Sequence, residues 1–121
     1  MKTPYKYRVT RHLDWSEIEN EYKELVQSNF FFKPLLDLVL YIRENEYDKR
    51  LYAYTSMHKL VISIYPDIAW NKEALHIELS TADKWLIEYF PKPCHSAEFV
   101  RQYAKNEIFK KFDDIIKYLN W

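Results

Sequence analysis

The stretch ALHIELSTADKWLIEYF, residues 74–90, decides the fold, because it has the pattern of two strands joined by a short loop. Apolar and polar residues alternate on both sides of the loop, and a period of two is typical of a half-buried strand. With residues 81–83 as the loop, one face of the hairpin carries apolar side chains, paired as Leu79 with Trp85, Ile77 with Ile87 and Leu75 with Tyr89.

The opposite face of this hairpin is more polar, with Ser80 opposite Lys84, Glu78 opposite Leu86, and His76 opposite Glu88. A slip by one residue would mix the two faces, so the hydrophobic pattern selects this register. An acidic face bordered by Tyr and Trp residues is suited to a basic protein, because charge steers encounter and aromatic side chains anchor it. We therefore take His76, Glu78, Lys84 and Glu88 as the candidate partner-binding residues.

Two further stretches of strand character precede the hairpin, RLYAYTS (50–56) and KLVISIY (59–65). No helical pattern separates them, so we predict a four-stranded antiparallel meander. Upstream, Asp14 and Glu17 have the spacing of a capping box at the start of a helix. We expect that helix to end near Asn29, a residue type that tolerates the left-handed conformation, and a second helix to begin at Pro34.

Apolar residues at helical spacing follow the hairpin and predict a long C-terminal helix. They are Phe99, Tyr103, Ile108, Phe109, Phe112, Ile115, Ile116 and Leu119. Asp113 and Asp114 are expected on its solvated side. The sequence thus predicts one α+β domain, residues 1–121, with two N-terminal helices, a four-stranded antiparallel meander and the C-terminal helix packed on one face of the sheet.

Composition excludes several classes of function. Lys plus Arg and Asp plus Glu both number 18, whereas nucleic-acid binders usually show a basic excess. A basic and aromatic segment at residues 5–11 is interpreted as an arm that docks on its own domain. Glycine is absent, which argues against phosphate-binding loops and dinucleotide fingerprints. A single cysteine, no signal-peptide pattern and no long apolar run favour a cytoplasmic protein without a membrane span.

The adjacent Cys94 and His95 are the first residues to weigh as catalytic groups. A thiol nucleophile needs a base within hydrogen-bond reach, and neighbours in an extended chain point their side chains apart. We predict no catalytic residue. The four histidines lack metal-ligand spacing and one cysteine cannot build a thiolate site, so we expect no metal and no cofactor. His76 with Glu88 is the alternative centre for a small enzyme or a ligand-binding site.

Four stretches in order resemble a family of small uncharacterised bacterial proteins: LYAYTSMHKLVIS, LHIEL, LIEYF and IFKKFDDIIKYLNW, which span residues 51–121. The family shares an LYA-x-TS stretch, an F/I-E-Y strand and a Phe-x-x-Phe helix that ends near a Trp. It is similar in size and style to the immunity proteins encoded beside secreted toxins. The resemblance implies binding of the kind an inhibitor shows, and it implies no catalytic residue.

Three hypotheses for the function follow. The first is a non-enzymatic protein-binding module, of the kind that an immunity protein represents, with another protein as its partner. The second is a small enzyme or ligand-binding protein centred on His76 and Glu88, with Cys94 as the weaker alternative. The third is a self-associating structural protein that pairs with a copy of itself as a homodimer. The sequence favours the first.

Overall fold

The computed structural model describes residues 9–69, 73–80, 84–91 and 97–121. The α-helices are α1 (Trp15–Ser28), α2 (Lys33–Glu44) and α3 (Ile108–Leu119). Short 3-10 helices span Phe30–Phe32, Tyr47–Lys49 and Lys105–Glu107. The strands are β1 (Val9–Arg11), β2 (Tyr52–Ser56), β3 (Lys59–Ser63), β4 (Asp67–Ala69), β5 (Ala74–Leu79), β6 (Lys84–Phe90) and β7 (Phe99–Ala104).

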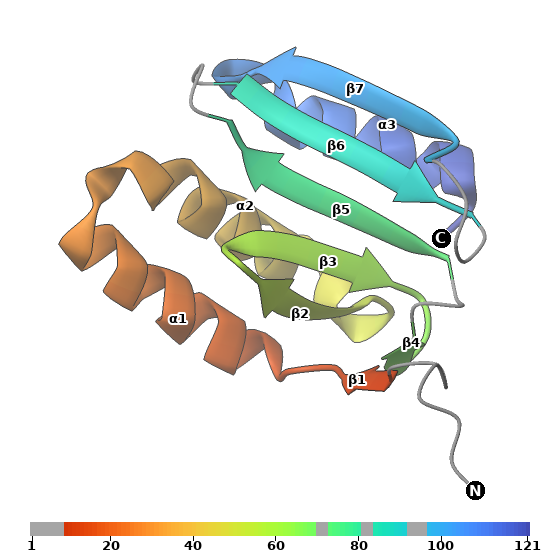
Figure 1. Ribbon diagram of the computed structural model, residues 1–121, viewed down its shortest axis with the longest axis horizontal. Coiled ribbons are helices and arrows are strands. Elements are labelled where there is room, and N and C mark those ends of the chain that lie inside the picture. Colours follow the sequence, from red (N-terminus) through yellow and green to blue (C-terminus); the bar gives the residue numbers. More distant parts are fainter. Residues whose placement is uncertain (1–8, 70–72, 81–83, 92–96) are drawn as a thin grey trace, which may run out of the picture.

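The main sheet is an antiparallel meander in the order β2-β3-β5-β6-β7, and the short strands β1 and β4 pair separately. The α+β class, the two N-terminal helices, the meander and the C-terminal helix are confirmed (Figure 1). The main sheet has five strands where the sequence predicted four. The additional strand is β7, at one edge of the sheet.

The register of the β5–β6 hairpin is the predicted one. Leu79 lies opposite Trp85 and Ile77 opposite Ile87, while His76 lies opposite Glu88. Residues 81–83, which the sequence assigns to the loop, lie outside the described residues. The confirmed register means that the hydrophobic alternation of this stretch alone placed both faces of the hairpin correctly.

The expectation of a helix that includes Phe99 and Tyr103 is wrong, because both residues belong to β7. Phe99 lies opposite Tyr89, and Tyr103 lies opposite Trp85. A separation of four residues returns a side chain to the same side of a helix and also to the same side of a strand. The spacing therefore fitted both structures, and α3 begins only at Ile108.

Both ends of α1 lie where the sequence predicts them. Asp14 is the N-cap, and its backbone N–H donates to Glu17 Oε1 at 3.2 Å, as half of a capping box does. Asn29 ends the helix but is extended, with φ −152°. Its side chain instead accepts a hydrogen bond from Phe31 N–H at 3.1 Å, which starts the next turn of the chain. Pro34 lies in the first turn of α2, as predicted.

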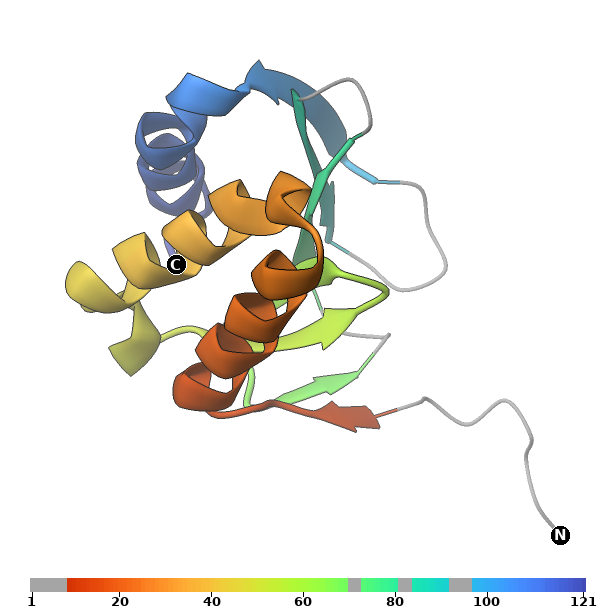
Figure 2. The same ribbon diagram turned by 90° about the vertical axis from the view of Figure 1, so that its left-hand side faces the viewer.

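All three α-helices lie on the same side of the main sheet, and none of the described residues forms a helix on the other side (Figure 2). The core forms between the two layers. Its largest fully buried side chains include Trp85, Tyr22, Phe112, Ile18, Leu35, Leu38 and Ile42. The ring centres of Tyr89 on β6 and Trp121 lie 6.1 Å apart, so β6 contacts the segment after α3.

The link between α2 and α3 passes through Asp113, which was expected on the solvated side of the helix. That expectation is wrong: Asp113 is half-buried, and its two carboxylate oxygens accept hydrogen bonds from the hydroxyls of Tyr41 and Tyr47, each at 2.6 Å. The bond to Asp113 and burial raise the pKa of Tyr41 to about 12. Burial and the same carboxylate raise the pKa of Tyr47 to about 12. Asp114 is exposed, as expected.

Candidate partner-binding face

The side of the main sheet without helices is called the open face here, and the strand register defines its members. Its middle row crosses all five strands and comprises Tyr54, Val61, His76, Glu88 and Val100. A second row comprises Ser56, Lys59, Glu78, Leu86 and Gln102, and a third comprises Tyr52, Ser63, Ala74 and Phe90. Three of the four predicted partner-binding residues lie in the first two rows.

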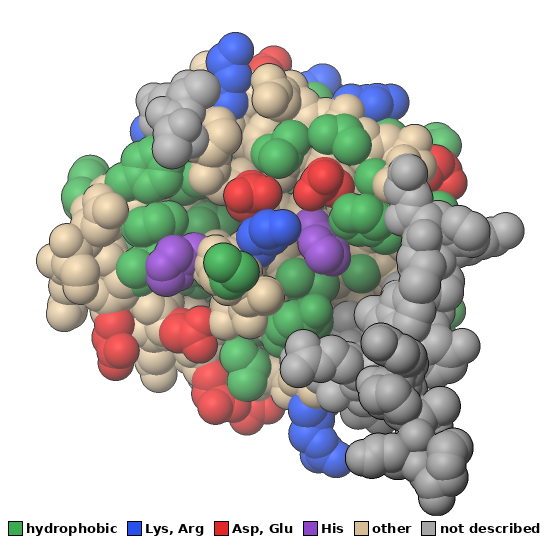
Figure 3. All heavy atoms as spheres, in the orientation of Figure 1, with side chains coloured by type: hydrophobic (Ala, Val, Ile, Leu, Met, Phe, Trp, Pro, Cys, Tyr) green, Lys and Arg blue, Asp and Glu red, His purple; other side chains and the backbone are tan. Residues whose placement is uncertain are grey.

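Hydrophobic side chains surround a small polar centre on the open face. This polar centre comprises Lys59, His76, Glu78 and Glu88. Val61 and Ala74 are buried there, packed against Tyr52 and Tyr54, although no helix covers them. Val100 is 50% exposed at the β7 edge. Figure 3 shows hydrophobic side chains on both sides of a cluster of acidic, basic and histidine side chains over β3, β5 and β6. The open face is thus less polar than the sequence predicted, and it combines apolar area with a few charges.

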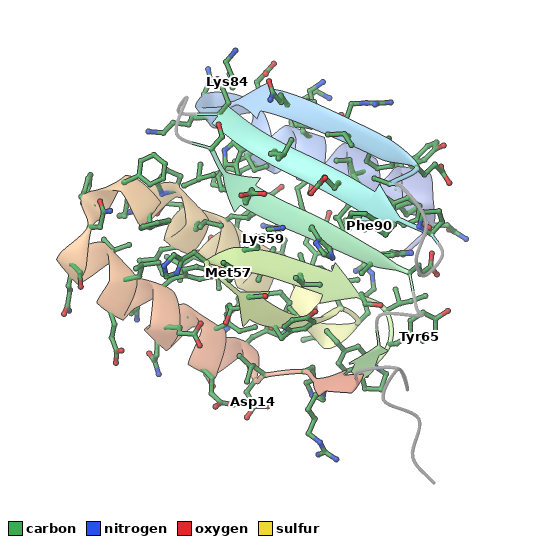
Figure 4. All side chains as sticks on the ribbon, in the orientation of Figure 1. Asp14, Met57, Lys59, Tyr65, Lys84 and Phe90 are labelled. Carbon is green, nitrogen blue, oxygen red and sulfur yellow. The ribbon has the colours of Figure 1, made fainter. Side chains whose placement is uncertain are left out.

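No Trp of the described sheet borders this face, because Trp85 points to the helices and is fully buried. The aromatic border consists instead of Tyr52, Tyr54 and Phe90. The expected Trp border is therefore wrong for Trp85, whose side chain belongs to the core. Phe90 and Lys84 lie at opposite ends of β6 (Figure 4). Lys84 is exposed and lies at the margin of the face rather than in its centre.

Lys59 is the residue of the polar centre that the sequence did not identify. Its Nζ lies 3.9 Å from Glu78 Oε1, and both side chains are about one third exposed. Figure 4 shows Lys59 at the start of β3, next to the turn that carries Met57. Lys59 offsets one of the two acidic groups, so the face is less acidic than its β5 and β6 residues alone suggested. Extending the register of β3 against β5 would have placed Lys59 opposite Glu78.

His76 is half-buried, and its ring centre lies 4.7 Å from that of Phe90. Burial, with a smaller contribution from the positive charge of Lys59, lowers the pKa of His76 to about 4. The imidazole is therefore neutral at pH 7. Within the described residues, neither a hydrogen bond nor an ion pair joins His76 to Glu88, although the two lie opposite each other.

Glu88 is half-buried, and no ion-pair or hydrogen-bond partner for its carboxylate occurs among the described residues. A carboxylate without such a partner can pair with an added cation or N–H donor. Glu88 is thus the group of the open face with the clearest capacity to bind something from outside.

The β2–β3 turn beside this polar centre has an uncommon backbone. Met57 and His58 form a two-residue turn, with φ values of 52° and 70°. Asn-Gly is the preferred sequence for such a turn, because the left-handed conformation costs free energy for residues other than glycine. Tyr22 Oη donates to His58 O at 3.1 Å, and the His58 ring lies 5.0 Å from that of Phe32. These contacts hold the turn so that Met57 stands 90% exposed.

Other candidate chemistry stays untested or finds no support. Cys94 and His95 lie outside the described residues, as do residues 5–8 of the N-terminal arm. No group of three or more His, Cys, Asp or Glu that could hold a metal ion occurs within the described ranges. Nor does any described helix have the length and hydrophobicity needed to cross a membrane. Surface grooves around Tyr22, Phe109 and Tyr118 include neither His76 nor Glu88.

Comparison of the chain with protein-family models, curated proteins and solved structures finds no match. The family resemblance noted from the sequence therefore stays a prediction, and the open face is interpreted from its own geometry.

Proposed function

We propose that this protein acts by binding another protein through the open face of its sheet, in the manner of an immunity protein that covers a toxin. The observation that carries the proposal is the composition of that face. A half-buried carboxylate without a described partner, Glu88, lies among apolar side chains on the side of the sheet that no helix covers. Apolar area with a few unmatched charges is typical of protein interfaces.

The partner chemistry follows from the same residues. An Arg or Lys of the partner would pair with Glu88, while apolar partner side chains would pack between Phe90, Leu86 and Val100. The exposed Met57 would contribute a flexible apolar contact at the margin of the interface. We expect this interaction to take place in the cytoplasm.

The alternative of a small enzyme at His76 and Glu88 has less support. A general base works best with a pKa near the operating pH, whereas burial lowers the pKa of His76 to about 4. The two side chains are not hydrogen-bonded to each other within the described part of the chain. They also lie outside the grooves described above.

The proposal is tested by capture of the partner from cells that naturally produce the protein, followed by mass spectrometry. The double variant Glu78→Lys, Glu88→Lys should lose the captured protein, because it places repulsive charges against the partner's cation. Its stability should fall by less than about 1 kcal/mol, since the Lys59–Glu78 pair is partly solvated. The matched control Glu24→Lys, Glu44→Lys changes exposed acids on the helices by the same charge. Equal capture by both double variants would refute the assignment of this face.

A further inference from the structure

The outer side of β7 is a free sheet edge within the described part of the chain, because β7 ends the order β2-β3-β5-β6-β7. The opposite edge is partly covered. Leu13 N–H donates to Ala53 O on β2 at 2.9 Å, and Thr55 Oγ1 of β2 donates to Glu21 of α1. An uncovered edge presents unpaired backbone groups to which another strand can add.

The hydrogen-bond ladder shows which β7 backbone groups point outward. Ser80 N–H donates to the first carbonyl of β6 at 2.8 Å. Because such groups alternate along an antiparallel strand, Ile87 directs its N–H and C=O toward β7, where its partner is Arg101. Val100 and Gln102, on either side of Arg101, therefore direct their backbone groups to the free edge. The exposed Arg101 guanidinium reaches back to Val100 O at 3.2 Å, which agrees with an outward carbonyl.

A groove of about 340 Å³ runs beside this edge, between β7 and α3. Its lining combines aromatic and apolar side chains with charges of both signs: Glu98, Phe99, Arg101, Tyr103, Asp114, Ile115 and Tyr118. Tyr118 is 70% exposed and Val100, on the edge itself, is 50% exposed. An added strand would cover Val100 and direct alternate side chains over the groove.

The charged side chains that line the groove indicate which molecule would bind beside this edge. Arg101 lies over the Phe99 ring at 5.2 Å, and Asp114 contacts only Lys110 of its own helix, at 3.5 Å, among the described residues. In a two-fold dimer, each contact between two different residues occurs twice. Arg101 of each copy would then meet Asp114 of the other, so the groove is complementary to itself.

We infer that β7 is a dimerisation edge: two copies pair their β7 strands antiparallel, and Arg101 of each copy faces Asp114 of the other. The two sheets become one continuous sheet. This inference does not depend on the proposed partner of the open face. It rests on the outward backbone groups of β7 and on Arg101 and Asp114, although Val100 and Gln102 border both surfaces.

Sedimentation equilibrium over a range of concentrations tests the inference. The wild-type chain should approach twice its mass of 14.9 kDa as concentration rises. Arg101→Asp and Asp114→Arg should each weaken the dimer about tenfold, through like-charge repulsion. The combined variant should restore the wild-type constant to within about threefold, because the pair is re-formed with reversed charges.

The backbone pairing has its own control. Gln102→Pro removes an outward N–H without touching the pairing with β6, whereas Gln102→Ala keeps that N–H. Only the proline variant should lose dimer, and circular dichroism at low concentration shows whether it is folded. Hydrogen exchange provides a readout without mutation: the amides of Val100 and Gln102 should gain protection with concentration, while that of Arg101 is protected throughout.

Three results would overturn the inference. The first is a wild-type chain that stays at 14.9 kDa at the highest attainable concentration. The second is a dimer that responds to none of these variants, because it would use another surface. The third is a wild-type dimer in which the amides of Val100 and Gln102 gain no protection with concentration, because its β7 edges would then be unpaired.

Discussion

Asp113 is the residue with the most consequential contacts outside the core. Its carboxylate accepts hydrogen bonds from the hydroxyls of Tyr41 and Tyr47, so a single side chain connects α3 to α2 and to the turn after α2. Phe109, one turn earlier on α3, stacks on Tyr41 with ring centres 4.4 Å apart. The sequence could not reveal this role, because the two tyrosines are 72 and 66 residues away in the chain.

Asp113→Ala should lower the free energy of unfolding by about 2 kcal/mol, because it leaves two partly buried hydroxyls without their charged acceptor. Asp114→Ala is the neighbouring control and should cost less than about 0.5 kcal/mol, since its pair with Lys110 is exposed. Urea denaturation at low chain concentration measures both. Equal losses for the two variants would contradict the role assigned to Asp113.

His76 should make stability depend on pH below 7. Burial holds its folded pKa at about 4, well below the 6.5 usual for histidine. Between these values the unfolded chain takes up a proton that the folded chain does not, so protonation favours unfolding as pH falls from 6.5 to 4. Stability should decrease on the order of 2 kcal/mol over this window through His76 alone.

The measurement is the difference in unfolding free energy between wild type and His76→Gln at several pH values. The wild type should lose more stability than the variant on acidification from pH 6.5 to 4. His58→Asn serves as the control, because it leaves His76 in place and should retain the wild-type difference. An imidazole signal of His76 that titrates near pH 6.5 in an NMR experiment would refute the burial argument.

The β5–β6 hairpin and β7 show what the sequence could and could not predict about the strands. The register of β5 against β6 was predictable because strict alternation admits only one pairing that keeps the faces separate. β7 was not, because Phe99 and Tyr103 are four residues apart and fit both periods. The alternation of Arg101 between them gave the only hint of a strand.

The β2–β3 turn carries strain that substitution should relieve. The chain has no glycine, so Met57 and His58 adopt positive φ values at a turn where glycine is preferred. Met57→Asn combined with His58→Gly should raise the free energy of unfolding by about 1 kcal/mol, after allowance for the lost contact with Phe32. Thermal and urea denaturation measure the change.

A matched control keeps the strain and removes only the exposed side chain. Met57→Ala should leave the stability within about 0.5 kcal/mol of the wild type, because Met57 is 90% exposed. If the Asn-Gly variant were less stable than the Met57→Ala variant, the turn would not be strained in the way its φ values indicate.

At the scale of the whole molecule, the layer of three helices explains both the core and the open face. Helices on one side of the sheet bury Ile77, Ile87 and Trp85, and the alternate residues of the same strands are left on the other side. The sequence predicted His76, Glu78 and Glu88 on one face. It did not identify Lys59 beside them, although the register of β3 against β5 sets Lys59 opposite Glu78. The proposed occupant of the open face is a second molecule, so the sequence of this chain does not specify it.

Photo-crosslinking from the open face tests the proposed function most directly. A photoreactive amino acid at Leu86, in the second row of the face, is activated in cells that naturally produce the protein, with the same group at Glu44 as control. We predict one discrete heterologous product from position 86, lost when Glu88→Lys is added, and none from position 44. Absence of a product at position 86, or the same products from both positions, would contradict it.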